Sequence, residues 1–279
     1  MRGQRVSLAG SCALVFALGC GSAETNDFND GPVSGGKPMG SGGKGGSGSA
    51  GTPGASGSGG MPSSSGSGGT DSGPIGDTGT FAENEEPIDD MEDGNAQLLM
   101  SGGRDGSWFV IKDETAGAST TPAAGASFTM VDNAVARGAS ERSAGLSGGG
   151  FGDWGAALTF NFRSLAGETV LPYDASAYSG LTFYGRSLKG SLDVRVTVPD
   201  ASSHPAGGIC AIENCYNHYH SDVTLSAEWK KYEIAFASLT KDGDTSGSFN
   251  EMVVFAVEFV VSGQTDFEFL IDDIALKKP

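Results

Sequence analysis

The chain has 279 residues, 46 of them glycine, and a formal net charge of −17. Glycine usually makes up about 7% of a protein, and here the excess lies in the first third, so only the remainder can build a core. The acidic balance argues against nucleic acid as a partner, because phosphate contacts need Lys and Arg. It also disfavours docking on an anionic membrane surface.

The N-terminus has the pattern of an export signal. The apolar run over residues 13–18 is too short to span a bilayer, so residues 1–20 are predicted to be a signal peptide. The segment Ala17-Leu18-Gly19-Cys20 resembles a bacterial lipobox, although Ala17 stands where Leu is usual. We therefore predict an exported lipoprotein, anchored to the outer membrane or cell surface only through lipid on Cys20. Lipidation at Cys12, or secretion with Cys20 unmodified, is the alternative.

Residues 21–82 are dominated by Gly and Ser. Such a segment cannot bury enough apolar surface to offset its ordering entropy, so it is predicted to be a disordered tether. Residues 83–279 then form the folded domain, and about 190 residues suffice for a single core. We expect this domain to be a monomer.

The folded part has a β pattern throughout. Strand-length apolar or alternating runs cover residues 108–111, 156–162, 181–184, 192–198, 229–236, 252–261 and 267–276. They are separated by Gly, Pro, Asp and Ser, a spacing typical of a sandwich or barrel. The helix candidates are single turns, such as residues 236–241. The predicted fold class is all-β, a β-sandwich of the jelly-roll type.

Several motifs resemble those of a known family. They are Ile88-Asp89-Asp90-Met91-Glu92-Asp93-Gly94 with Gly106-Ser107-Trp108-Phe109, then Tyr178-Ser179-Gly180-Leu181-Thr182-Phe183-Tyr184, Trp229-Lys230-Lys231-Tyr232 and Phe269-Leu270-Ile271-Asp272-Asp273-Ile274. In this order they resemble galactose-binding-like jelly-roll modules, and among these the family-11-type carbohydrate-binding modules. The resemblance implies a glycan or polysaccharide as partner, although the same sandwich carries many functions.

The last predicted strand contains a carboxylate among apolar residues. Period-two alternation places Leu270, Asp272, Ile274 and Leu276 on one face. A buried carboxylate needs a cation, several hydrogen-bond donors or a raised pKa. The resemblance implies a structural calcium ion (Ca2+) held by Asp272 and by Glu92 on the first strand.

Asp113 is a weaker third candidate for the calcium ion. In the alternative interpretation, Asp272 accepts backbone hydrogen bonds and the acidic segment 83–93 is a solvated edge.

The segment 204–220 contains all three histidines and two cysteines, Cys210 and Cys215. Two thiols in an exported chain are expected to pair, which would stiffen the loop. Aromatic rings stack on sugars and imidazoles bind hydroxyl groups, so the predicted glycan contacts are Tyr216, His218, Tyr219 and His220. A zinc site and a purely structural loop are the alternatives, although the spacing of the last two histidines is short for zinc.

Four further residues are predicted to contact a glycan. Tyr184 and Arg186 share one predicted strand, Arg195 lies on the next, and the three would line one groove. Trp154 stands in a glycine-bounded segment and is expected to be exposed. Trp108 and Trp229 are instead expected in the core.

Enzyme motifs occur without their structural context. Gly145-Leu146-Ser147-Gly148-Gly149 matches a hydrolase nucleophile elbow, but no helix is predicted after it. The predicted function is therefore non-catalytic carbohydrate binding by a surface-anchored lipoprotein. A structural or adhesive envelope lipoprotein that binds protein or wall polymer is the alternative, and a hydrolase is less favoured.

Overall fold

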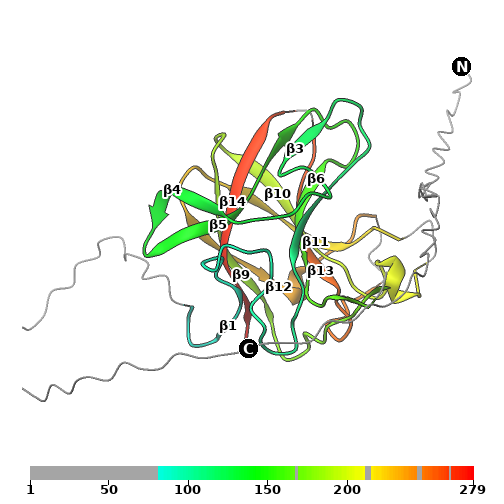
Figure 1. Ribbon diagram of the computed structural model, residues 1–279. Coiled ribbons are helices and arrows are strands. Elements are labelled where there is room, and N and C mark those ends of the chain that lie inside the picture. The colour runs from blue at the N-terminus through cyan, green and yellow to red at the C-terminus, as the bar shows by residue number, and fades with distance from the viewer. Residues whose placement is uncertain (1–80, 167–168, 211–214, 244–246, 264) are drawn as a thin grey trace, which may run out of the picture. The chain divides into compact units, whose positions relative to one another are not determined.

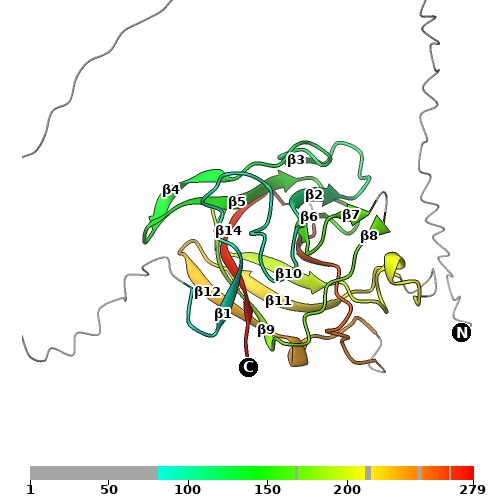
Figure 2. The same cartoon turned by 60° about the horizontal axis from the view of Figure 1, so that its bottom comes forward.

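The computed structural model describes residues 81–166, 169–210, 215–243, 247–263 and 265–279. The predicted signal peptide, Cys20 and the tether as far as residue 80 lie outside the described residues. Two antiparallel sheets face each other, as Figures 1 and 2 show. Within the described ranges, no helix is long and apolar enough to cross a membrane.

The larger sheet has seven strands. They are β1 (Glu85–Asp89), β3 (Ser119–Thr121), β4 (Val131–Arg137), β5 (Ser140–Gly149), β9 (Gly180–Ser187), β12 (Lys230–Ala235) and β14 (Phe267–Lys277). The order is β12-β9-β14-β5-β3, with β1 paired to β14 and β4 paired to β5. The first and last strands therefore lie side by side, as the jelly-roll prediction requires.

The smaller sheet has five strands in the order β11-β10-β13-β6-β2. They are β2 (Trp108–Lys112), β6 (Ala156–Asn161), β10 (Leu192–Val198), β11 (Tyr219–Leu225) and β13 (Ala256–Val261). A separate ribbon joins β7 (Leu165–Ala166) and β8 (Thr169–Val170), and two single turns are η1 (Pro205–Gly207) and η2 (Phe236–Ser238).

The core lies between the two sheets and is rich in aromatic rings. Phe183 on β9 packs edge-on against Phe259 on β13, with ring centroids 5.0 Å apart, and so joins the sheets. Trp108 on β2 is 2% exposed and lies 4.8 Å from Phe160. Alternation along each strand directs these rings inward, as is usual for packed sheets. The predicted all-β sandwich is confirmed.

A β-bulge in β14 changes which residues share a face. The pairing with β9 shifts between Asp272 and Ala275, and Asp273 has a φ of 41°. Asp272 is paired with Tyr184, on the side of the sheet opposite Phe183, whereas Ile274 and Leu276 belong to the core. The prediction that Leu270, Asp272, Ile274 and Leu276 lie on one face is therefore wrong, because a bulge reverses the alternation.

Candidate functional site

The side of the larger sheet that faces away from the core carries most of the polar side chains considered below. Here it is called the outer face, and it comprises the outward side chains of β12, β9 and β14. On β9 these are Thr182, Tyr184 and Arg186. Register places Lys231 and Asp272 on either side of Tyr184, and Glu233 beside Thr182.

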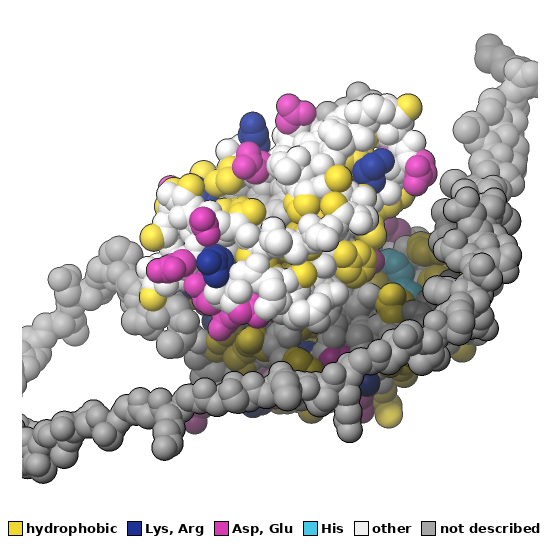
Figure 3. Space-filling model, in the orientation of Figure 1, with side chains coloured by type: hydrophobic (Ala, Val, Ile, Leu, Met, Phe, Trp, Pro, Cys, Tyr) yellow, Lys and Arg dark blue, Asp and Glu magenta, His cyan; other side chains and the backbone are white. Residues whose placement is uncertain are grey.

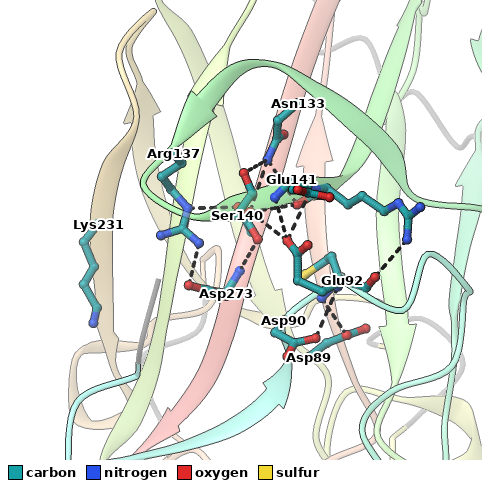
Figure 4. Close-up of polar contacts among 12 residues, drawn as sticks. Asp89, Asp90, Glu92, Asn133, Arg137, Ser140, Glu141, Lys231 and Asp273 are labelled. Carbon is teal, nitrogen blue, oxygen red and sulfur yellow. Dashed lines mark hydrogen bonds and ion pairs between the residues drawn. The ribbon is translucent and has the colours of Figure 1, made fainter. Parts of the chain in front are cut away.

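The hairpin of β4 and β5 bends over this face and buries Arg137 against it. Its guanidinium donates from Nε to Asp272 Oδ2 at 2.9 Å and from Nη2 to Asp273, as drawn in Figure 4. Ser140, just after the turn, donates to Asp272 Oδ2 at 2.6 Å. Burial raises the pKa of Asp272, although Ser140 and Arg137 oppose this. Burial also disfavours the charged guanidinium, but Asp272 and Asp273 raise the pKa of Arg137.

The same guanidinium covers an aromatic ring. Arg137 Cζ lies 4.2 Å from the centroid of the Tyr184 ring, and Lys231 Nζ lies 5.4 Å from it. The hairpin is also fastened at Val135, whose carbonyl oxygen accepts from Trp229 Nε1 at 3.1 Å. Trp229 was expected in the core, but it is half-buried immediately before β12, with Arg186 Cζ 5.7 Å from the centroid of its ring.

Beside the hairpin the outer face is hollowed. This hollow has a volume of about 390 Å³ and is lined by Asn84, Glu85, Thr182, Lys231, Tyr232, Glu233 and Lys277. Lys231 pairs with Glu85 at 2.7 Å, and Lys277 pairs with Glu233. Burial opposes ionisation of Glu85, but hydrogen bonds from Lys231, the Ala82 backbone and Thr182 hold the pKa of this carboxyl below its usual value. The hollow therefore presents closely spaced donors and acceptors.

The residues predicted to hold calcium are engaged by protein donors. Glu92 lies in the turn after β1 rather than on the strand. Its Oε1 accepts from the Glu141 amide at 2.9 Å and lies 3.0 Å from Ser140 Oγ, whose single proton is donated to Asp272. Ser140 thus joins Glu92 to Asp272, while Arg137 supplies the positive charge. In the part of the chain that the structure describes, no three His, Cys, Asp or Glu residues are grouped to hold a metal ion. Because Arg137 already balances Asp272 and protein groups surround Glu92, these residues do not fit a calcium ion. Calcium binding itself stays a prediction.

Asp113 has a different role from the one predicted. Its carboxylate accepts from the backbone amides of Thr115 at 2.9 Å, Asp153 at 3.1 Å and Gly155 at 2.9 Å. Asp113 therefore fixes the loop between β5 and β6. Trp154 in that loop is 42% exposed, so its predicted exposure is confirmed.

The predicted disulfide between Cys210 and Cys215 is confirmed. Because both sulfur atoms are in the disulfide bond, neither is available as a thiolate ligand for zinc. The His/Tyr loop is nevertheless mainly structural. His218 Nδ1 lies 3.0 Å from Ser203 Oγ, and burial lowers the pKa of His218 to about 3, so this imidazole is neutral. Of the four predicted contacts, only Tyr216 is exposed, at 64%.

The prediction that Tyr219 and His220 contact a glycan is wrong, because both side chains are buried. Tyr219 begins β11, points into the core and packs on Phe249 with ring centroids 5.5 Å apart. His220 is 7% exposed and its Nδ1 lies 3.1 Å from the His218 carbonyl oxygen. The segment was interpreted as loop, whereas a strand buries both side chains.

Arg186 and Arg195 cannot line one groove. They lie on consecutive strands, but β9 belongs to the larger sheet and β10 to the smaller one. Arg195 is paired on its own sheet with Asp222 at 2.9 Å and Asp242 at 2.6 Å. Of the two arginines, only Arg186 belongs to the outer face.

A buried carboxyl that the sequence reasoning missed is Asp89, at the end of β1. It is 0% exposed and accepts from Trp108 Nε1 at 2.7 Å and from the Met91 amide at 3.0 Å. Burial raises the pKa of Asp89 to about 7 despite these donors. Its place between the apolar Ile88 and, two residues further on, Met91 was the available signal.

This raised pKa predicts a pH dependence of stability. Asp89 is protonated in the folded state between its unfolded pKa near 3.8 and its folded pKa of about 7. The free energy of unfolding should therefore fall as pH rises through that window, at up to about 1.4 kcal/mol per pH unit. Urea unfolding from pH 4 to pH 8 measures the slope. Asp89→Asn should make the fall smaller, whereas the exposed Asp153→Asn should leave it unchanged; equal slopes in all three proteins would contradict the assignment.

Ser147 is the nucleophile candidate of the Gly145–Gly149 motif. It lies on β5 opposite Glu268, and in the described part of the chain no hydrogen bond joins it to a histidine. The geometry therefore does not support the nucleophile elbow that the sequence motif suggested.

The fold and the outer face together define a β-sandwich of jelly-roll type with one polar, hollowed sheet face. No family model matches the sequence, and no curated protein matches it. Among solved structures, a similar fold occurs in the family 11 carbohydrate-binding module of the Clostridium thermocellum cellulase Lic26A-Cel5E. It is 18% identical, with 71% of this chain and 97% of that chain covered and a TM-score of 0.43.

A family 11 module from the same organism, in complex with a beta-1,3-1,4-mixed-linked tetrasaccharide, is also 18% identical. It covers 71% of this chain and 98% of that chain, with a TM-score of 0.45. The family 30 module of the cellulase Cel9D-Cel44B is 15% identical, covers 53% and 82%, and has a TM-score of 0.39. The first two of these modules carry the family name that the sequence motifs resemble.

Proposed function

We propose that residues 81–279 form a non-catalytic glycan-binding module and that the hollow of the outer face is its binding site. The observation that carries this proposal is the lining of the hollow. Two Lys–Glu pairs and the Thr182 hydroxyl surround a depression of about 390 Å³. Polar groups of this kind exchange hydrogen bonds with sugar hydroxyls, which both donate and accept.

The charge of the outer face suits a hydroxyl-rich ligand better than a strongly charged one. On the side of the molecule that Figure 3 shows, acidic side chains are interspersed with a few Lys and Arg side chains. Most cations of the outer face already have a carboxylate partner: Arg137, Lys231 and Lys277 are all paired. The family-11-type motifs in the sequence point to the same ligand class.

The proposed module binds a glycan without cleaving it. A glycosidase needs one carboxyl group that is protonated near neutral pH, as general acid. Glu85 has a lowered pKa, and Glu233 is ion-paired with Lys277. Neither carboxyl group of the hollow is arranged as a general acid. We further propose that export and a lipid on Cys20, followed by a tether over residues 21–82, place the module at the cell surface.

A glycan array on the full-length chain tests the function. We expect retention of a neutral, hydroxyl-rich polysaccharide, and binding about tenfold weaker (about 1.4 kcal/mol) for Glu233→Ala. Tyr216→Ala, on the disulfide loop, is the matched exposed control and should bind as the wild type does.

If Tyr216→Ala abolished binding and Glu233→Ala did not, the site would lie at the loop instead. If the array retained nothing while the chain bound an envelope protein, the adhesive alternative would replace glycan binding.

A further inference from the structure

The hairpin of β4 and β5 covers Tyr184, the outward residue of β9 that follows Thr182 of the hollow. The outward residues of β9 follow one another as Thr182, Tyr184 and Arg186. Thr182 lines the hollow, but the next position, Tyr184, lies beneath the Arg137 guanidinium. A ligand that extends from the hollow along β9 therefore meets Arg137 at the next outward position, Tyr184.

Arg137 fills the layer in which a sugar ring would stack on Tyr184. Stacked partners of an aromatic ring have centroids about 4.5–7 Å away, and Arg137 Cζ already lies 4.2 Å from the Tyr184 centroid. The guanidinium is held from below by two carboxylates, Asp272 and Asp273, and Arg137 is 4% exposed. Displacing it would leave two buried carboxylates without their cation, which is costly.

A second contact fastens the hairpin to the same face of the sheet, on the other flank of β9. Trp229, immediately before β12, donates to the Val135 carbonyl oxygen at 3.1 Å. Arg137 ties the hairpin to β14, and Trp229 ties it to β12, so the hairpin crosses β9 from one neighbouring strand to the other. The barrier at Tyr184 is thus held at two points.

We infer that the hollow takes the end of a glycan chain rather than an internal segment, with Arg137 as the residue that sets this specificity. The inference rests on the glycan-binding function proposed above. An internal segment needs an exit on both sides of its bound sugar, whereas a chain end needs only one. The ligand class is therefore the terminal sugar of a hydroxyl-rich polysaccharide.

The number of protein molecules bound per glycan chain tests the inference. The full-length protein is titrated by calorimetry with size-fractionated chains of whichever polysaccharide the array retains. We expect one protein molecule per chain, independent of chain length. A number that grows with chain length would overturn chain-end binding while leaving glycan binding intact. Absence of binding to every glycan would overturn the proposed function itself.

Two variants test the role of Arg137. The triple variant Arg137→Met/Asp272→Asn/Asp273→Asn removes the guanidinium without leaving buried charge, and it should raise the number bound on long chains several-fold. Trp229→Phe keeps an aromatic ring but loses the pyrrole part of the indole and with it the donor to Val135, and it should raise the number less.

Circular dichroism verifies folding of both variants, and Trp229→Phe serves alone if the triple variant does not fold. An unchanged number per chain in a folded variant would show that the hairpin does not set the specificity.

Discussion

Replacing Arg137 by Met should lower the free energy of unfolding by about 3–5 kcal/mol, the usual cost of removing one partner from a buried ion pair. Arg137 is 4% exposed and is the cation for Asp272 and Asp273, both of which would stay buried in the variant. Urea unfolding at pH 7 measures the change. Arg195→Met breaks the exposed pairs with Asp222 and Asp242 and should cost no more than about 1 kcal/mol.

Two further measurements separate Arg137 from a metal ion. The triple variant that also neutralises Asp272 and Asp273 should recover most of the lost stability, because it leaves no unpaired charge. A chelator should leave the melting temperature of the wild type unchanged if Arg137 is the cation that balances Asp272. A chelator-induced drop, together with a small effect of Arg137→Met, would favour calcium instead.

Trp108→Ala should be the most destabilising substitution in the core of the smaller sheet, at about 3–5 kcal/mol. The indole is 2% exposed, packs on Phe160 and donates to Asp89. Trp108→Phe keeps a six-membered ring for packing but loses the pyrrole part of the indole and its N–H donor to Asp89, so it should cost about 1–3 kcal/mol. The exposed Trp154→Ala is the matched control and should stay within about 0.5 kcal/mol. Thermal or urea unfolding gives all three values, and equal losses at the two tryptophans would contradict the assigned core.

The strands that carry a strong apolar alternation could be predicted from the sequence. Leu192–Val198 was predicted with the bounds that β10 has, and Trp108 was expected in the core. The hairpin of β4 and β5 could not be predicted in the same way, because β5 is built mostly of Gly, Ser and Ala. These small residues allow β4 to lie close to β5: a Cβ atom at Gly145 would lie 3.0 Å from Val131 Cγ2.

The site was harder to predict than the fold, because its residues meet only through long-range pairing. The sequence places Asp272 on an apolar strand, and the need for a partner followed correctly from that. The identity of the partner could not be predicted, because Arg137 is 135 residues away in the sequence and reaches Asp272 only where the hairpin bends over the sheet. Tyr184 and Arg186 were correctly assigned to one strand, but nothing local shows that β9 and β10 separate into different sheets.

The pairing of β1 with β14 has a mechanical consequence. The chain that precedes residue 81 joins the domain at β1, so tension in that chain is applied first to this strand. Asn84 and Glu85 line the hollow, and the Asn84 carbonyl oxygen accepts from the Lys278 amide at 2.8 Å. A pull that peels β1 from β14 would dismantle one wall of the hollow before it reaches the aromatic core. If the hollow binds glycan as proposed, that binding and the resistance of the domain to load would depend on the same backbone hydrogen bonds between β1 and β14.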